Sequence, residues 1–215
     1  DLIPSEYLQR NPFRGGGGTA IRLAKSQETW PGRLNLGVNR AYRKGTLRSS
    51  GPLEGRLSRY TAACGPVIYR GDNFPEAYQG NSFICEPSGN FIRRNKHIEI
   101  GGNIIAENAE NGNEWMSSSD ERFRPVNLYN GPSGGLYIVD MYRGIVQHRI
   151  YLTSYLRNQA ESRGLEKGID NGRIYRVVYK GQNTSSQKLA KASSDQLVSA
   201  LSNDNGWVRD TAQRL

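Results

Sequence analysis

The sequence predicts a mainly β, loop-rich fold, and three observations carry this prediction. Its 215 residues include 25 glycines and only 36% hydrophobic residues, so turn-forming residues would interrupt long helices. Twelve tyrosines, five phenylalanines and three tryptophans still supply enough apolar area for a core. Short β-prone runs separated by Gly, Pro, Asn or Asp recur from residue 56 onward.

In the first half of the chain the pattern predicts four short strands and a long loop. The strands are expected at residues 56–60, 67–70, 82–85 and 90–93. The polar, Asn-rich stretch at 101–113 predicts a loop.

In the second half, two strands are expected at 125–130 and 136–140, around the turn formed by residues 131–135. A third, alternating strand is expected at 173–179, after a helix at 151–163. Strand, Gly-rich turn, strand, loop and strand in sequence order are typical of one propeller blade.

The end of the chain predicts a pair of helices. Ser193 and Gln196 have the spacing of a capping box, and Leu197, Ala200 and Leu201 form one apolar helical face. Asn205 and Gly206 are expected to end this helix as an αL cap, and residues 207–215 to begin a second one. Such pairs are the units of α-solenoids.

Composition excludes several functions for this chain. No run approaches the ~18 apolar residues of a membrane span, and no signal peptide is visible. The sequence has no C-x-x-C or C-x-x-C-H motif, and only two histidines, which excludes a zinc knuckle, haem attachment and a multi-histidine metal site. The net charge is +9, but the arginines are scattered singly, so nucleic-acid binding is the weakest hypothesis.

Five long runs are specific enough to resemble a family. They lie at residues 31–42, 60–75, 80–95, 118–157 and 172–177. They resemble the propellers of membrane-bound dehydrogenases in large haem-binding C-x-x-C-H proteins of planctomycetes, verrucomicrobia and related bacteria. Those propellers are similar to glucose/sorbosone dehydrogenases, which are six-bladed quinoproteins. The closing stretch resembles the first HEAT-type repeat that follows the propeller in that group.

The resemblance implies the C-terminal half of a six-bladed β-propeller with a short HEAT-like helical tail. The expected divisions are an irregular Gly-rich segment at 1–30, propeller blades at 31–181 and a helical repeat beginning at 187–215. It further implies a periplasmic or extracellular protein, with the other blades, further HEAT-like helices and a cytochrome c domain elsewhere in the same polypeptide. Pyrroloquinoline quinone would be the cofactor, and haem c would lie outside this chain.

The candidate site residues lie before the predicted strand at 125–130 and at or after the end of the strand at 136–140. Arg124 and Arg143 could hold an anionic group such as a quinone carboxylate, with Asp140 at the strand end. The alternative is structural: Asp140–Arg143 or Glu121–Arg124 ion pairs that fix the loop. His148 could accept a proton near neutral pH, although the family's general base histidine falls in a part of the pattern that this sequence lacks.

Cys64 and Cys85 flank a hairpin-like unit. In an exported protein they could form a disulfide, and the alternative is two buried free thiols.

Two functions therefore stay open. The first is a dehydrogenase-like propeller that oxidises a sugar or other alcohol and passes electrons to a cytochrome c domain. The second is a non-catalytic propeller module that recognises a polysaccharide or a protein partner.

Overall fold

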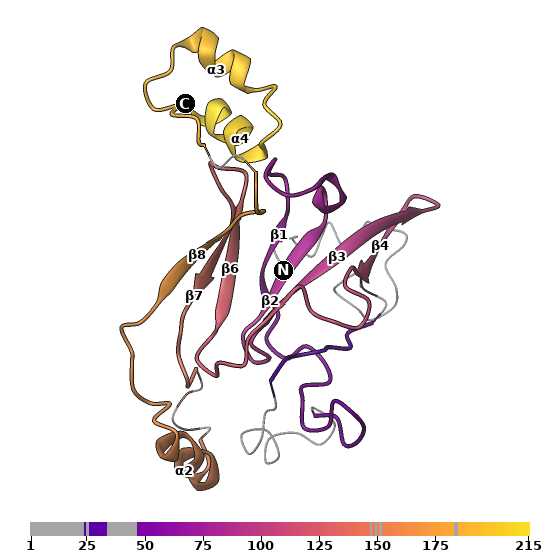
Figure 1. Ribbon diagram of the computed structural model, residues 1–215, viewed down its shortest axis with the longest axis vertical. Coiled ribbons are helices and arrows are strands. Elements are labelled where there is room, and N and C mark those ends of the chain that lie inside the picture. Colours follow the sequence, from indigo (N-terminus) through magenta and orange to yellow (C-terminus); the bar gives the residue numbers. More distant parts are fainter. Residues whose placement is uncertain are drawn as a thin grey trace, which may run out of the picture.

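The computed structural model describes residues 24, 26–33, 47–146, 148, 150, 152–182 and 185–215. These residues form two antiparallel β-sheets that lie side by side, with a helix pair at one end of the molecule and a single helix at the other (Figure 1). The mainly β fold class is therefore confirmed. The propeller arrangement stays a prediction, and most of the predicted segment 1–30 falls outside the described residues.

The first sheet is a meander in sequence order, β1-β2-β3-β4, and β5 adds to β3. Its strands are β1 (Cys64–Ile68), β2 (Ser82–Glu86), β3 (Phe91–Ile100), β4 (Asn103–Asn108) and β5 (Met116–Ser117). A short 3-10 helix, η1 (Glu76–Tyr78), lies in the connection between β1 and β2.

The second sheet is a three-stranded meander of β6 (Pro125–Asn130), β7 (Leu136–Asp140) and β8 (Arg173–Val177). The predicted bounds of β6 and β7 are confirmed. In the turn between them, the Gly131 N–H donates to the Gly135 carbonyl and the Gly134 N–H donates to the Gly131 carbonyl, both at 3.0 Å. Gly134 has a φ of +73°, which a glycine adopts without steric cost.

The two sheets share one apolar core. β1 and β2 of the first sheet lie against β6 of the second. The approach is close at Gly65, where a Cβ atom would lie 2.5 Å from the Cα of Asn127. The buried residues of the shared core are Tyr69, Phe74, Phe83, Cys85, Ile92, Phe123, Leu128, Leu136 and Ile138. Because both sheets contribute to it, this core ties them together.

The three α-helices lie where the sequence predicts helices, but only α3 begins at the predicted cap. In α2 (Ser154–Ser162), the Thr153 hydroxyl accepts a hydrogen bond from the N–H of Leu156. The capping box of Ser193 and Gln196 is confirmed at the start of α3 (Ser194–Ala200). The αL cap expected at Asn205 is wrong: its φ is −77°, and its side chain instead caps the start of α4 (Gly206–Arg214). None of the helices within the described ranges is long and apolar enough to cross a membrane.

One loop prediction and one strand prediction in the first half are wrong. Residues 101–113 do not form one long loop, because Gly101 and Gly102 make a two-residue turn between β3 and β4 with φ of +58° and +78°. Residues 56–60 form only isolated bridges, Leu57 with Leu47 and Arg59 with Glu28. This segment lies across the first sheet without joining its ladder.

Candidate functional site

Arg124, expected to hold an anionic cofactor, is buried directly before β6 and binds backbone. Its Nε donates to the carbonyl of Arg143 at 2.9 Å, Nη1 to that of Pro87 at 2.6 Å and Nη2 to that of Gly144 at 2.9 Å. Burial, together with the positive charge of Arg33, lowers the pKa of Arg124 to about 10. Arg124 thus joins the β2–β3 turn to the loop after β7.

Asp140 fixes the backbone of that loop. Its Oδ1 accepts the N–H of Arg124 at 2.7 Å and the N–H of Tyr142 at 2.8 Å. Tyr142 has a φ of +46°, a region that L-residues rarely adopt. Its hydroxyl donates to Asp120 at 2.8 Å, and this bond raises the pKa of Tyr142. Asp140 is therefore a positioning residue for a strained turn.

Glu121 pairs with arginines other than the one expected. Instead of Arg124, it binds Arg33 at 2.5 Å and also contacts Arg163 after α2. The carboxylate of Asp140 likewise accepts backbone N–H groups rather than the Arg143 guanidinium. Neither of the two ion pairs that the sequence suggested occurs among the described residues.

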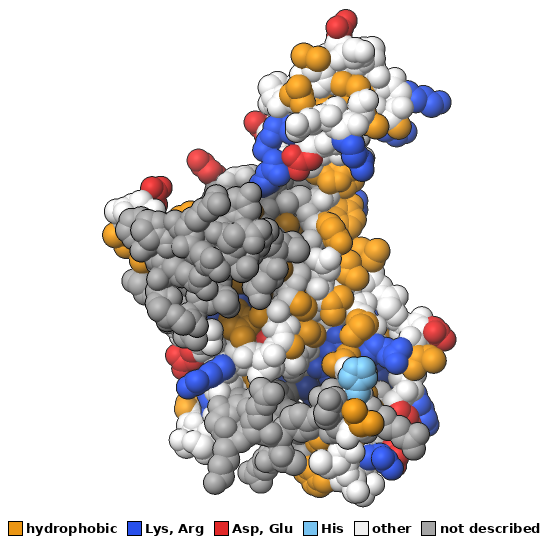
Figure 2. Space-filling view, turned by 180° about the vertical axis from the view of Figure 1, so that it is seen from behind, with side chains coloured by type: hydrophobic (Ala, Val, Ile, Leu, Met, Phe, Trp, Pro, Cys, Tyr) orange, Lys and Arg blue, Asp and Glu red, His pale blue; other side chains and the backbone are white. Residues whose placement is uncertain are grey.

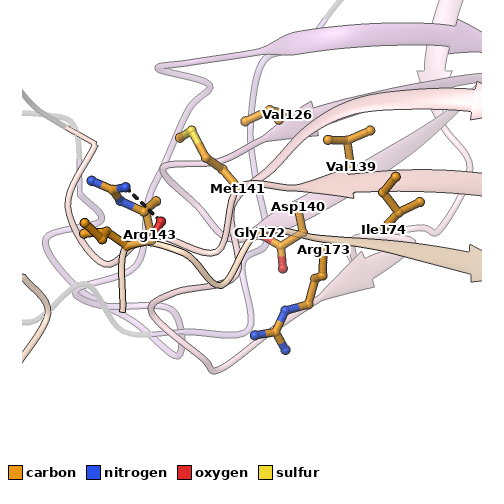
Figure 3. A pocket seen from close by; sticks show the side chains of 9 residues that line it. Val126, Val139, Asp140, Met141, Arg143, Gly172, Arg173 and Ile174 are labelled. Carbon is orange, nitrogen blue, oxygen red and sulfur yellow. Dashed lines mark hydrogen bonds between the residues drawn. The ribbon is translucent and has the colours of Figure 1, made fainter. Parts of the chain in front are cut away.

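Arg143 lines a pocket of about 430 Å³ at one end of the second sheet. Figure 3 shows Val126, Val139, Met141 and Ile174 on one side of the sheet, while Arg143 and Arg173 extend in different directions. The Arg143 Nη1 donates to the carbonyl of Ile169 at 3.1 Å. The Arg173 guanidinium lies 3.5 Å from the centre of the Tyr142 ring. The two guanidinium groups do not converge on one point, so they do not form a shared binding site for an anion. Most of the other side chains that line the pocket are apolar.

The pocket lies at one end of a larger apolar surface on the second sheet. The register places Tyr129, Tyr137 and Arg176 in one row across β6, β7 and β8, and Asn127, Val139 and Ile174 in the next. Paired residues point to the same side of a sheet, opposite to the core residues Leu128 and Ile138. These six residues are called the outer face below.

His148 is exposed, and it is not among the described residues that line the pocket. Its part in proton transfer stays a prediction. His97, on β3, lies 2.9 Å from the Ser82 hydroxyl through its Nε2 atom.

Cys64 and Cys85 are direct register partners on β1 and β2, and both are free thiols in this structure. Burial raises the pKa of both, to about 12 for Cys85, where the neighbouring Cys64 adds to the effect. The disulfide stays a prediction. Opposed positions on antiparallel strands bring Cβ atoms within the range from which a disulfide forms.

The sequence analysis did not foresee the contact between the predicted turn at residues 131–135 and the segment that follows β1. The buried Tyr69 hydroxyl donates to the carbonyl of Gly134 at 2.6 Å and accepts the N–H groups of Asn73 and Phe74. A Cβ on Gly71 would lie 2.0 Å from that same carbonyl. The glycines of both turns were the available signal, because close backbone approach requires them.

Glu86 is a second residue that the sequence did not single out. It is fully buried at the end of β2, and burial raises its pKa. Its carboxylate accepts the N–H groups of Thr61 and Ala62 at 2.9 Å and that of Ser88 at 3.1 Å. Its hydrogen bonds therefore hold the segment before β1 against the sheet.

The residues expected to hold pyrroloquinoline quinone do not fit that group. Every guanidinium nitrogen of Arg124 donates to a backbone carbonyl, and Arg143 extends away from it towards Ile169. The Oδ1 atom of Asp140 accepts two N–H groups, and its Oδ2 atom is buried without a hydrogen-bond partner among the described residues. No cofactor step is derived from these residues.

These features define a mainly β protein of two packed antiparallel meanders, braced by buried arginines and carrying a helix pair. The chain belongs to the family described as a domain of unknown function, DUF7133, whose family model matches residues 2–181. Helices α3 and α4 lie after the matched residues. Neither the curated proteins nor the solved structures gave a match.

Proposed function

We propose that this chain forms two consecutive blades of a dehydrogenase-like β-propeller and contributes scaffold to it. The observation that supports this best is the order of the strands. Each sheet runs in sequence order from a first strand, β1 or β6, and these two first strands pack against each other. Blades of a propeller have this arrangement, with their first strands nearest the axis.

In this proposal the complete protein oxidises a sugar or other alcohol in the periplasm or outside the cell and passes electrons to a cytochrome c domain. The general base and the quinone contacts then come from other parts of the polypeptide. Arg124 and Asp140 serve as braces, since the Arg124 guanidinium and the Asp140 Oδ1 atom already bind backbone of this chain.

The test uses the protein at its natural length. Pyrroloquinoline quinone is titrated by absorbance, and dye reduction is followed with a panel of aldoses. We expect Arg143→Ala and His148→Ala to keep quinone affinity and rate within about twofold, because a group that only packs does not alter transition-state binding. A loss of about tenfold or more in either variant, at an unchanged melting temperature, would contradict the scaffold role.

The second candidate is a non-catalytic module that recognises a protein partner. The exposed apolar outer face supports it, since monomeric proteins rarely expose large contiguous apolar patches. A natural-length protein that binds no quinone and reduces no dye with any aldose would overturn the dehydrogenase proposal and favour this candidate.

A further inference from the structure

Four asparagines of the chain are followed by glycine, and the fold holds two of these pairs and leaves two open. The pairs are Asn111–Gly112, Asn130–Gly131, Asn171–Gly172 and Asn205–Gly206. In such a pair the glycine nitrogen can attack the amide carbon of the asparagine side chain, because glycine has no Cβ to hinder the approach. A hydrogen bond to either reacting group opposes this attack, so the structure predicts which pairs react.

The pair at Asn130 is held at both reacting groups. Its Oδ1 accepts the N–H of Arg70 and its Nδ2 donates to the carbonyl of Ile68, both at 2.9 Å. The N–H of Gly131 donates to the carbonyl of Gly135 at 3.0 Å. The side chain and the attacking nitrogen are therefore both engaged.

The pair at Asn205 is held in the same way. Its Oδ1 accepts the N–H of Trp207 at 2.9 Å, and its Nδ2 donates to the carbonyl of Gly131 at 3.1 Å. The N–H of Gly206 donates to the carbonyl of Arg70 at 2.6 Å. Asn205 is also buried, at 2% exposure.

The pairs at Asn111 and Asn171 are open. Both asparagines are exposed. Within the part of the chain that the structure describes, their side chains make no hydrogen bond, and neither do the N–H groups of Gly112 and Gly172. The electrophile and the nucleophile are therefore free at both positions.

The space around the glycines divides the pairs in the same way. A Cβ on Gly112 or Gly172 would have its nearest neighbour at 3.9 or 3.7 Å, an ordinary contact distance. A Cβ on Gly131 or Gly206 would lie 2.0 or 2.7 Å from another side chain. Room to close a five-membered ring thus exists only where the hydrogen bonds are absent.

We infer that Asn111 and Asn171 are sites of spontaneous deamidation, and that the fold protects Asn130 and Asn205. The glycine nitrogen forms a bond to the side-chain carbon, and the amide nitrogen leaves as ammonia. Water then opens the resulting succinimide and gives aspartate or isoaspartate. Each event replaces a neutral amide with a carboxylate, and this chemistry does not depend on the proposed function.

The modification at Asn171 changes the charge beside the pocket. Gly172 and Arg173 line the pocket together with Arg143, and the Arg173 Nε donates to the Asn171 carbonyl at 3.1 Å. Figure 2 shows basic side chains gathered beside the hydrophobic run, towards the end of the molecule away from the helix pair. A carboxylate at position 171 partly neutralises this basic end, and isoaspartate adds a main-chain atom directly before β8.

The test is a time course of the natural-length protein at mildly alkaline pH, read by peptide mass mapping that separates asparagine, aspartate and isoaspartate. Asn130 and Asn205 are the internal controls. The same protein in urea is the reference in which the fold holds none of the four pairs. Gly172→Ala is the matched variant, because its Cβ makes only ordinary contacts and the folded state is kept.

We expect Asn111 and Asn171 to deamidate at least about tenfold faster than Asn130 and Asn205 in the folded protein, because a held pair reacts only after local opening. The four rates should become similar in urea. Gly172→Ala should slow the reaction at Asn171 and leave that at Asn111 unchanged. Equal rates at the four positions of the folded protein would overturn the inference, and so would a folded protein in which Asn111 and Asn171 stay intact. An unchanged rate at Asn171 in Gly172→Ala would also overturn it, because the glycine nitrogen would then not be the nucleophile.

Discussion

Arg93 on β3 and Glu114 form an ion pair that solvent does not reach. Their side chains are 3% and 0% exposed, and the Arg93 Nε lies 2.9 Å from the Glu114 Oε2. The guanidinium lies between the rings of Trp30 and Tyr60, at 5.0 and 5.1 Å from their centres. The Glu114 Oε1 atom also accepts a hydrogen bond from the backbone N–H of Trp30 at 2.8 Å. One buried pair therefore holds the segment before β1 against the first sheet.

Glu114→Gln should destabilise the fold strongly. Removing one charge of a buried pair leaves the other without compensation, which typically costs about 3 to 5 kcal/mol. The free energy of unfolding in urea measures this loss. Replacing both partners, as in Arg93→Met with Glu114→Leu, should cost less than Glu114→Gln alone. A double variant as unstable as the sum of the two single variants would contradict this account.

Asn205→Asp should release the helix pair from the second sheet. The Asn205 Oδ1 caps α4 by accepting the Trp207 N–H, while its Nδ2 donates to the carbonyl of Gly131 at 3.1 Å. Aspartate keeps the cap but sets a buried carboxylate against a carbonyl, a loss of about 2 kcal/mol. Hydrogen exchange of the α4 amides should accelerate.

Asn203→Asp is the matched control for that prediction, because the Asn203 Oδ1 accepts the N–H of Asn205 and a carboxylate keeps this bond. Equal exchange rates in the two variants would show that the Asn205 amide does not hold the helix pair.

The sequence predicted elements best where turn chemistry and alternation agree. The strands around the Gly131–Gly135 turn were located to the residue, and the capping box of α3 was correct. The β3–β4 hairpin was missed because its asparagines favoured a loop, although Gly101 and Gly102 form a two-residue turn between alternating residues. Local patterns thus specified most of the second sheet and less of the first.

The candidate site was harder to predict because its contacts join distant segments. Arg124 carries the charge of an anion site, but the carbonyls that it binds belong to Pro87 and to the loop after β7. No local residue spacing indicates that the Arg124 guanidinium will donate to the carbonyl of a residue 37 positions earlier in the chain. Arg143 and Asp140 line a pocket in the structure, and the apolar side chains that line it with them follow from the register of three strands.

Alkylation of Cys85 under reducing conditions should keep rising with pH well above the range of ordinary thiols. Burial raises its pKa from 9.0 to about 12, so its thiolate fraction at neutral pH is about a thousandfold lower. The unfolded chain releases this proton near pH 9 while the folded chain retains it. Stability should therefore fall by about 1.4 kcal/mol per pH unit from pH 9 to 12. A labelling rate that levels off near pH 9 in the folded protein would contradict the shift, and the same chain in urea is the control.

Oxidised glutathione should convert Cys64 and Cys85 into a disulfide. The two thiols lose their hydrogens, one S–S bond forms, and two molecules of glutathione are released. The protein mass then falls by two hydrogen atoms, and both cysteines resist alkylation. Closing the loop between register partners should add about 3 kcal/mol to stability in the chain-entropy model. Cys64→Ser is the control, and two alkylated thiols after oxidation would disprove the bridge.

Gly134→Ala should be far more damaging than Gly80→Ala, although the two glycines have nearly the same φ, +73° and +72°. At Gly80 nothing lies within 4 Å of an added Cβ, so only the left-handed backbone conformation costs free energy, about 1 kcal/mol.

At Gly134 the Cβ would lie 1.9 Å from the Asp72 Oδ1 and 2.8 Å from the backbone nitrogen of Asn73. Relieving that overlap must move the Gly134 carbonyl away from the buried Tyr69 hydroxyl and separate the two turns. We expect an additional loss of about 2 kcal/mol or more in urea unfolding. Equal losses in the two variants would mean that the contact between the turns adds nothing to stability.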